Sequence, residues 1–404
     1  MNLFSGSIKP IGPVKAVMGF HDELTAIRRD LHAYPELGFL ETRTAKRVAD
    51  ELDKIGIEYH TGIGKTGIVA VIHGKDGKGS KGVGLRADMD ALPMVEENTF
   101  EHASKIKGCM HACGHDGHTT MLLGAARYLA QTRNFQGTAY MIFQPGEEGY
   151  AGGKAMMEDG LFKRFPADEI YALHNWPGQP QGKIGVSPGP AMAAADKFNI
   201  LIEGRGGHGA HAYMTIDPVV VAGHIITAVQ AIVSRNVSAI DTAVISICSM
   251  NGGHPDAFSV IPRTVTLGGT VRTFKPEIQE LVERRLKVTC ESIAAAFGAK
   301  ATVNYERVYP ATINTLKESQ FAARVAASLI GEENVIPDLP PSMGAEDFSF
   351  MLQEKPGAYC RLGQSTSAEP IFLHNTRYDF NDAVIPLGAG FLAALAEQAM
   401  PVSA

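Results

Sequence analysis

Hydrophobic positions in the first half of the chain alternate between helical and strand spacing. A helix is predicted from four apolar residues that recur at intervals of three or four, namely Ala45, Val48, Leu52 and Ile55. The apolar runs 67–72, 137–143 and 169–173 have the length of buried strands, and another helical pattern begins at Met121. Such alternation predicts an α/β sheet domain with helices on both faces.

The pattern changes after Pro190. Predicted strands cover 197–203, 243–247, 265–272 and 301–305, and predicted helices cover 217–235 and 276–297. This β-α-β-β-α-β order is typical of a ferredoxin-like α+β domain. A chain of 404 residues also exceeds what one hydrophobic core usually organises. We therefore expect a two-domain α/β protein, with the second domain inserted into the first. The catalytic domain is expected to comprise residues 1–187 and 309–404, and the inserted domain residues 188–308.

The segment 110–118, Met-His-Ala-Cys-Gly-His-Asp-Gly-His, contains a thiol, three imidazoles and a carboxylate within nine residues. Cys113 and His115 are two residues apart and could bind one borderline-soft ion such as Zn²⁺. A redox thiol or a polar loop with hydrogen-bonded histidines would also account for these residues. The density of ligand chemistry favours a metal site.

Three further segments contain the same kinds of side chain. Glu147 and Glu148 follow the predicted strand 137–143, and His174 follows the strand 169–173. One carboxylate of the pair could bind a metal while its neighbour handles a proton. His374 lies near the C-terminus after an apolar stretch. Taken alone, the two glutamates would indicate a solvated loop, and His374 would indicate a histidine packed in the core. These residues support a metal site only because they occur together with the segment 110–118.

The motifs resemble the M20 metallopeptidase family. They are RADMDALP at 86–93, HACGHDGH at 111–118, QPGEEG at 144–149 and HNWP at 174–177. The resemblance runs from about residue 24 to 390. It is closest to the amidohydrolase branch, which contains hippurate hydrolases, N-acyl-amino-acid amidohydrolases and auxin-conjugate hydrolases. It implies two divalent metal ions per subunit, Zn²⁺ or Mn²⁺, with Co²⁺ or Ni²⁺ as alternatives.

The resemblance also assigns roles in the first domain. The residues that match the family's metal ligands are Cys113, His115, Glu148, His174 and His374. Five ligands exceed one tetrahedral site, so we expect Cys113 to bridge two ions, and Glu147 matches the general base. Asp88 and Asp90 would either orient ligand histidines or cap the ends of strands.

In the inserted domain, expected to form a lid and a dimer interface, the resemblance picks out three residues. His208, between glycines, matches a catalytic histidine that completes the partner subunit's site and stabilises the oxyanion. Arg272 matches the arginine that binds the substrate carboxylate. Ser259 stands where the family generally has asparagine, so substrate recognition is expected to differ there.

These residues predict a metal-dependent hydrolase that cleaves the linear amide of N-acyl amino acids, releasing a carboxylic acid and the amino acid. A dipeptidase or carboxypeptidase of the same fold is the near alternative. A non-catalytic ligand-binding or thiol-regulated protein is the alternative of another class, although such a copy would be expected to lose Glu147 or several ligands. A phosphoesterase is disfavoured because the motifs contain few carboxylates.

Composition restricts the partners. A net charge of −6 without basic runs argues against nucleic acid. The apolar run 218–234 contains His224, Thr227 and Gln230, which favours a buried helix over a membrane span. Five cysteines without framework spacing, and an N-terminal segment without the apolar stretch of a signal peptide, predict a cytoplasmic protein. We expect a homodimer or a dimer of dimers acting on a small molecule.

Overall fold

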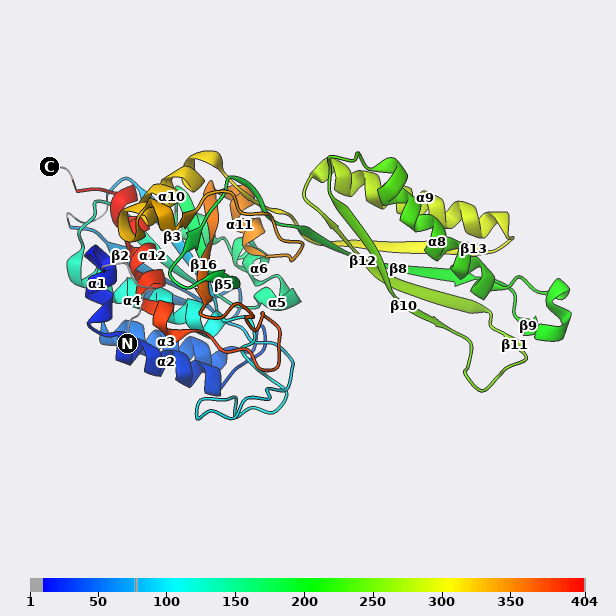
Figure 1. Ribbon diagram of the computed structural model, residues 1–404, viewed down its shortest axis with the longest axis horizontal. Coiled ribbons are helices and arrows are strands. Elements are labelled where there is room, and N and C mark those ends of the chain that lie inside the picture. The colour runs from blue at the N-terminus through cyan, green and yellow to red at the C-terminus, as the bar shows by residue number, and fades with distance from the viewer. Residues whose placement is uncertain (1–9, 76, 78, 403–404) are drawn as a thin grey trace. The chain divides into compact units, whose positions relative to one another are not determined.

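The chain forms two compact units in the computed structural model (Figure 1). The structure describes residues 10–75, 77 and 79–402, so the N-terminal segment used above for localisation lies largely outside the described residues. Unit 1 comprises the described residues of Met1–Ala191, Thr312–Pro340 and Asp347–Ala404. Unit 2 comprises Met192–Ala311 and Pro341–Glu346.

Unit 1 is built on an 8-stranded sheet with the order β1-β2-β4-β3-β5-β16-β6-β15. Its strands are β1 (Glu58–Ile63), β2 (Gly67–His73), β3 (Gly82–Asp88), β4 (Thr138–Gln144), β5 (Glu169–Pro180), β6 (Ile184–Gly185), β15 (Val335–Ile336) and β16 (Gly357–Ser365). The central neighbours β4, β3, β5 and β16 are parallel, whereas β1, β2 and β4 pair antiparallel. The α/β sheet predicted from the sequence is therefore present, and its strand pairing is mixed.

Helices surround this sheet (Figure 1). They are α1 (Gly12–Met18), α2 (His21–Ala33), α3 (Thr42–Lys54), α4 (His115–Thr132), α5 (Glu147–Tyr150), α6 (Gly152–Glu158), α7 (Leu161–Arg164), α10 (Leu316–Ile330), α11 (Phe348–Glu354) and α12 (Ile385–Ala399). The central helix α4 is buried along most of its length, and Leu122, Ala125 and Leu129 are fully buried. Because its packing fixes the position of α4, it also fixes the segment that precedes this helix.

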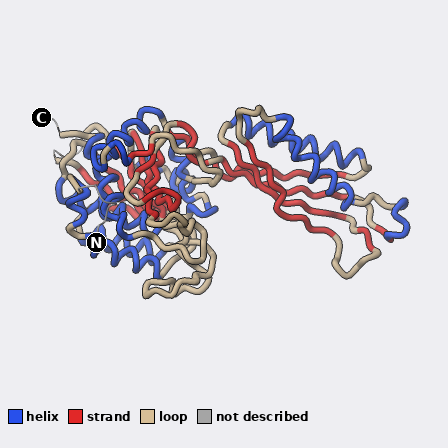
Figure 2. The backbone as a smooth tube through the Cα atoms, viewed as in Figure 1, coloured by secondary structure: helices blue, strands red, loops and turns tan. Residues whose placement is uncertain are grey.

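Unit 2 has a 4-stranded antiparallel sheet with the order β10-β12-β8-β13. Its main elements are β8 (Ala194–Glu203), α8 (Pro218–Asn236), β10 (Ala243–Gly252), β12 (Thr264–Thr273), α9 (Pro276–Ala296) and β13 (Lys300–Tyr309). Short strands β9 (Gly207–His208) and β11 (Val260–Ile261) pair separately, and β7 (Gly189–Met192) pairs with β14 (Thr312–Asn314). Both long helices lie on one face of the sheet (Figure 2).

Helix α8 is half-buried rather than enclosed. Val221, Ile225 and Val229 pack into the core of unit 2, whereas Val219 and Val220 on the outer side are 38% and 48% exposed. By length and composition, α8 is the one helix in the described part of the chain that could cross a membrane. Its apolar inner face packs against the sheet of unit 2, so the core of this unit explains the apolar residues on that face.

The parallel strands place the predicted chemistry at one edge of the unit 1 sheet. Strand β3 ends at Asp88 and the adjacent β4 ends at Gln144, three residues before Glu147. Open α/β sheets bind ligands at the carboxyl ends of such strands. The prediction that His174 follows its strand was wrong. Strand β5 continues to Pro180 because β16 pairs with it beyond His174.

Candidate metal centre

The segment with Cys113 and His115 contains a glycine, Gly114, whose conformation and surroundings disfavour any other residue. Gly114 has φ +94° and immediately precedes α4, whose first residue is His115. A Cβ at this position would collide with the side chains of Asn175 and Tyr378. The left-handed backbone turns both ligand side chains into the same buried space, since Cys113 is 8% exposed and His115 is fully buried.

The Glu147–Glu148 turn is held by Asp90. The carboxylate of Asp90 accepts hydrogen bonds from the backbone N–H groups of Glu147 and Glu148, each at 2.9 Å. Oδ1 of Asp90 also lies 3.3 Å from Nδ1 of His115. Asp90 therefore caps the turn after β4 and lies beside the ring of a candidate ligand.

His174 presents one ring nitrogen to Cys113. Its Nδ1 lies 2.7 Å from the carbonyl oxygen of Asn175, so Nδ1 donates the hydrogen bond and Nε2 has a free lone pair. Nε2 is 3.5 Å from the Cys113 sulfur. Burial and the nearby His118 hold the pKa of His174 well below its usual value, which keeps the ring neutral, as a metal ligand must be.

His374 approaches from the C-terminal region of the chain. Its backbone N–H donates to the carbonyl of Ala112 at 2.8 Å, which fixes it beside Cys113. Its Nε2 lies 3.2 Å from Oε1 of Glu148. The residue has φ +61°, an uncommon conformation for a non-glycine residue and one often found at functional sites.

The five predicted ligands thus come together in unit 1. Two groups of donor atoms each lie within 4.8 Å of one another. One group is Cys113, His115 and His174, and the other is Cys113, Glu148 and His374. Because the Cys113 sulfur belongs to both groups, the geometry favours it as a bridging ligand. Glu147 lies beside them, grouped with His115 and Glu148.

The electrostatics of these residues fit divalent cations. Nε2 of buried His115 makes no hydrogen bond with any described residue, and its nearest carboxylates are Asp88 at 3.7 Å and Glu148 at 4.0 Å. Burial lowers the pKa of His115, but the carboxylates of Asp88 and Asp90 outweigh burial and raise it to about 10. Burial and the charge of Glu148 raise the pKa of Cys113 well above its usual value. A cation among these groups would displace both protons and neutralise the carboxylates.

The other two histidines of the HACGHDGH segment have different surroundings. His118 contacts Asp88 through Nδ1 at 2.6 Å and Asn175 through Nε2 at 2.5 Å, so both of its nitrogens are occupied. His111 is 1% exposed, and burial lowers its pKa to about 4. Neither was predicted as a ligand. The contacts of His118 agree with that, and His111 belongs to none of the donor groups among the described residues.

The sequence did not predict the groups that support Asp88. Arg86 donates to Asp88 at 2.7 Å, to Asp347 at 3.1 Å and to Gln144 at 2.9 Å. Burial raises the pKa of Asp88, but His115 and Arg86 outweigh it and hold this carboxyl well below its usual range. The signal in the sequence was that Arg86, Gln144 and Asp347 all belong to segments that resemble family motifs, Asp347 to the segment Met-Gly-Ala-Glu-Asp-Phe at 343–348.

The remaining predicted residues lie in unit 2. His208 in β9 is exposed and pairs with Val260 of β11, and the N–H of Gly209 donates to the carbonyl of Ser259 at 2.7 Å. His208 and Ser259 are therefore neighbours despite their separation in sequence. Arg272 lies on β12, where Nη1 contacts the hydroxyl of Thr270 and the carbonyl of Val271, and burial lowers its pKa.

Comparison with known proteins assigns the class. The model of peptidase family M20/M25/M40 matches residues 84–398, so the chain belongs to this family. The hippurate hydrolase of Campylobacter jejuni is 42% identical over 95% of this chain and 98% of its own length. The N-acetylcysteine deacetylase of Bacillus subtilis is 37% identical over 93% of this chain and 97% of its own.

A solved structure supports the fold across both units. The YXEP protein of Bacillus subtilis, described as a dinuclear metal-binding peptidase from the M20 family, superposes with a TM-score of 0.82. It is 34% identical, and the match covers 95% of this chain and 99% of that one. The predicted family and its class of metal-dependent amide hydrolases are therefore confirmed.

Proposed function

We propose that this protein is a two-metal amidohydrolase that cleaves N-acyl amino acids into a carboxylic acid and an amino acid. The observation that carries this proposal is the pair of donor groups that share Cys113 and lie beside Glu147. The similarity to a hippurate hydrolase and an N-acetylcysteine deacetylase supports the substrate class. The mixed thiolate, imidazole and carboxylate donors suit Zn²⁺, with Mn²⁺ as the alternative.

The residues divide the chemistry between binding and proton transfer. The ligands would be Cys113, His115, Glu148, His174 and His374, with Cys113 as the bridge. When bound, the metal ions polarise the amide carbonyl and lower the pKa of water. Glu147, adjacent to the ligands but held by Asp90 through its backbone, takes a proton from the attacking water and delivers it to the leaving amine.

Unit 2 would supply substrate recognition. Its element order supports a ferredoxin-like lid and dimerisation domain, corresponding to the inserted residues 188–308. Arg272 would bind the substrate carboxylate, Ser259 would modify recognition of the acyl group, and His208 would stabilise the oxyanion in the partner subunit. Strand β10 lies at one edge of the unit 2 sheet, where a second copy could pair with it in a cytoplasmic homodimer.

The test is metal removal combined with a substrate panel. Protein shown by elemental analysis to be metal-free should release no amine from acetyl, benzoyl or longer acyl amino acids. Zn²⁺ or Mn²⁺ should restore the reaction, but not in Glu147→Gln. Turnover by metal-free protein would contradict the proposal. Cleavage restricted to dipeptides would instead assign a dipeptidase.

A further inference from the structure

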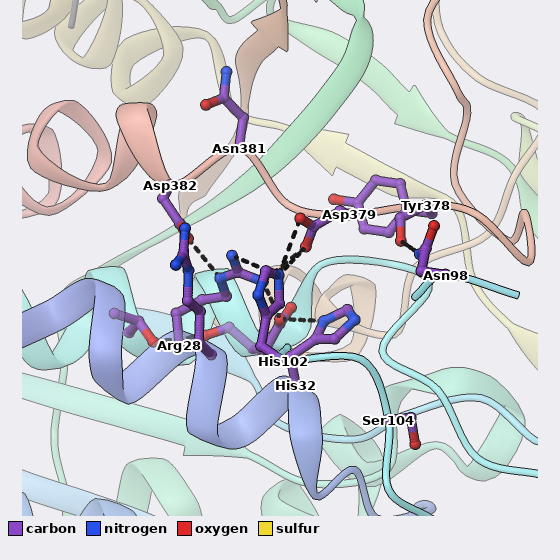
Figure 3. Close-up of polar contacts among 12 residues, drawn as sticks. Arg28, His32, Asn98, His102, Ser104, Tyr378, Asp379, Asn381 and Asp382 are labelled. Carbon is purple, nitrogen blue, oxygen red and sulfur yellow. Dashed lines mark hydrogen bonds and ion pairs between the residues drawn. The ribbon is translucent and has the colours of Figure 1, made fainter. Parts of the chain in front are cut away.

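A fully buried arginine on α2 lies among carboxylates from segments that are far apart in the sequence. The Arg28 side chain is 0% exposed, and its Nε lies 2.5 Å from Oδ1 of Asp382. Its Nη1 lies 2.8 Å from Asp379 and 3.7 Å from Asp116. Figure 3 shows Arg28 directed toward the segment that contains Asp379 and Asp382.

His32, one turn farther along α2, contacts the same Asp116. Its Nδ1 donates to Oδ2 of Asp116 at 2.8 Å, and its Nε2 lies 3.2 Å from Glu96. His32 and Asp116 are both buried. Asp116 is therefore contacted by two residues of α2, Arg28 and His32, that lie one turn apart.

The carboxylates in this cluster flank the candidate ligands. Asp116 directly follows His115 in the first turn of α4, and Asp379 lies five residues after His374. The two ligand segments also touch each other, through the bond from the His374 N–H to the Ala112 carbonyl. Arg28 consequently bridges the segment with Cys113 and His115 to the segment with His374.

We propose that Arg28, assisted by His32, is a positioning residue of the metal centre that holds these two ligand segments at a fixed separation. The inference rests on the proposed function. A guanidinium has five N–H donors in a rigid plane and can bind several carboxylates at once. Groups that orient ligands typically change metal affinity or activity by about 10- to 100-fold when removed.

The neighbouring Arg29 shows why loop attachment alone does not explain Arg28. Arg29 is 51% exposed and also pairs with Asp382, through Nε at 2.9 Å. An exposed arginine thus already attaches the C-terminal loop to α2. Arg28 is the one of the two that also pairs with Asp379 and Asp116, the residues next to the ligand segments.

The test is metal affinity, measured without substrate. Zn²⁺ and Co²⁺ are titrated into the apo protein against a chromophoric chelator, and the thiolate-to-cobalt absorption reports coordination by Cys113. Arg28→Met should weaken affinity for at least one ion by about 10- to 100-fold. The metal affinity of Arg28→Lys should lie between those of the wild type and Arg28→Met, because one ammonium cannot replace the planar guanidinium.

Two control variants separate positioning from stability. Arg29→Met removes an arginine that contacts Asp382 alone among these carboxylates, and should change affinity by less than about threefold. Leu24→Ala lies on the same helix and removes buried packing without touching a carboxylate. It should lower stability while leaving the cobalt spectrum unchanged.

The outcomes distinguish this inference from the proposed function. If Arg28→Met binds both ions with wild-type affinity, or if Leu24→Ala weakens binding equally, Arg28 has only a structural role. Should Arg28→Met fail to fold, Asp379→Asn, at a side chain that is 32% exposed, is the milder replacement and should show the same weakened binding. A wild-type protein that binds no divalent ion would instead overturn the proposed function.

Discussion

Replacing His32 by asparagine is expected to remove a pH-dependent contribution to the stability of unit 1. His32 is fully buried, and burial alone lowers its pKa. The hydrogen bond and charge of Asp116, together with the hydrogen bond of Glu96, outweigh burial and raise the pKa of His32 to about 9. The other titratable groups around the imidazole are Arg28, His102 and His111.

The magnitude follows from the two protonation equilibria. The pKa of an unperturbed histidine is 6.5, whereas that of His32 in the folded protein is about 9. One pKa unit corresponds to about 1.4 kcal/mol, so the protonated pair stabilises the fold by roughly 3 kcal/mol. Because the folded pKa is raised, this contribution is complete below pH 6.5 and is lost as the pH rises through 9.

Urea unfolding followed by the fluorescence of Trp176 measures this effect. Trp176 is the single tryptophan and lies in unit 1, so the signal reports that unit. The measurements are made in chelator, because metal binding is itself pH-dependent. Between pH 6.5 and 9 the wild type should lose about 1.4 kcal/mol per pH unit more than His32→Asn. Equal slopes for the two proteins would refute the ion-pair reasoning.

Further predictions concern the proposed chemistry. Glu147→Gln should retain metal and lose turnover by at least about 10²-fold, whereas Glu148→Gln should lose metal first; elemental analysis beside steady-state rates distinguishes them. Cys113→Ser should lose metal and activity, and normal metal content would make Cys113 structural. Arg272→Ala should lower kcat/KM for acyl amino acids, by an amount that corresponds to about 2 to 5 kcal/mol of lost transition-state stabilisation. An equal loss for substrates whose α-carboxylate is replaced by an amide would exclude a role of Arg272 in binding that carboxylate. Mixing Glu147→Gln with His208→Ala should restore activity if His208 acts in the partner subunit, provided mass measurements confirm subunit exchange.

The ligand segments could be predicted because their residue types are unusual and closely spaced. Cys113 and His115 lie two residues apart, and Glu147 and Glu148 directly follow an apolar strand. Such patterns are local in the sequence. Since β3 and β4 are adjacent parallel strands, their carboxyl ends lie together, and no long-range contact has to be known to predict this. The sequence could not fix where β5 ends, because its extension past His174 depends on pairing with β16, nearly two hundred residues later.

Most of the supporting contacts could not be predicted, because they join residues that are far apart in the sequence. Arg28 is an ordinary position of an amphipathic helix, and its carboxylates Asp379 and Asp382 lie more than three hundred and fifty residues away. Only tertiary packing shows that the α2 arginine at position 28 faces inward while Arg29 faces solvent. An analysis of hydrophobic periodicity cannot find polar clusters of this kind, because it assigns every arginine to the solvent-exposed face of a helix.

The three histidines of the HACGHDGH segment illustrate why residue type alone does not determine a ligand. All three are buried, yet His118 has both ring nitrogens occupied by Asp88 and Asn175. His111 belongs to neither donor group that contains Cys113 and lies near His32, with ring centroids 6.4 Å apart. Nε2 of His115 faces carboxylates without a hydrogen bond to any residue in the described part of the chain. A nitrogen whose lone pair is already used cannot bind an ion, which excludes His118. Both ring nitrogens of His111 also make no hydrogen bond with a described residue, so His111 is set apart from His115 by its position outside the Cys113 donor groups.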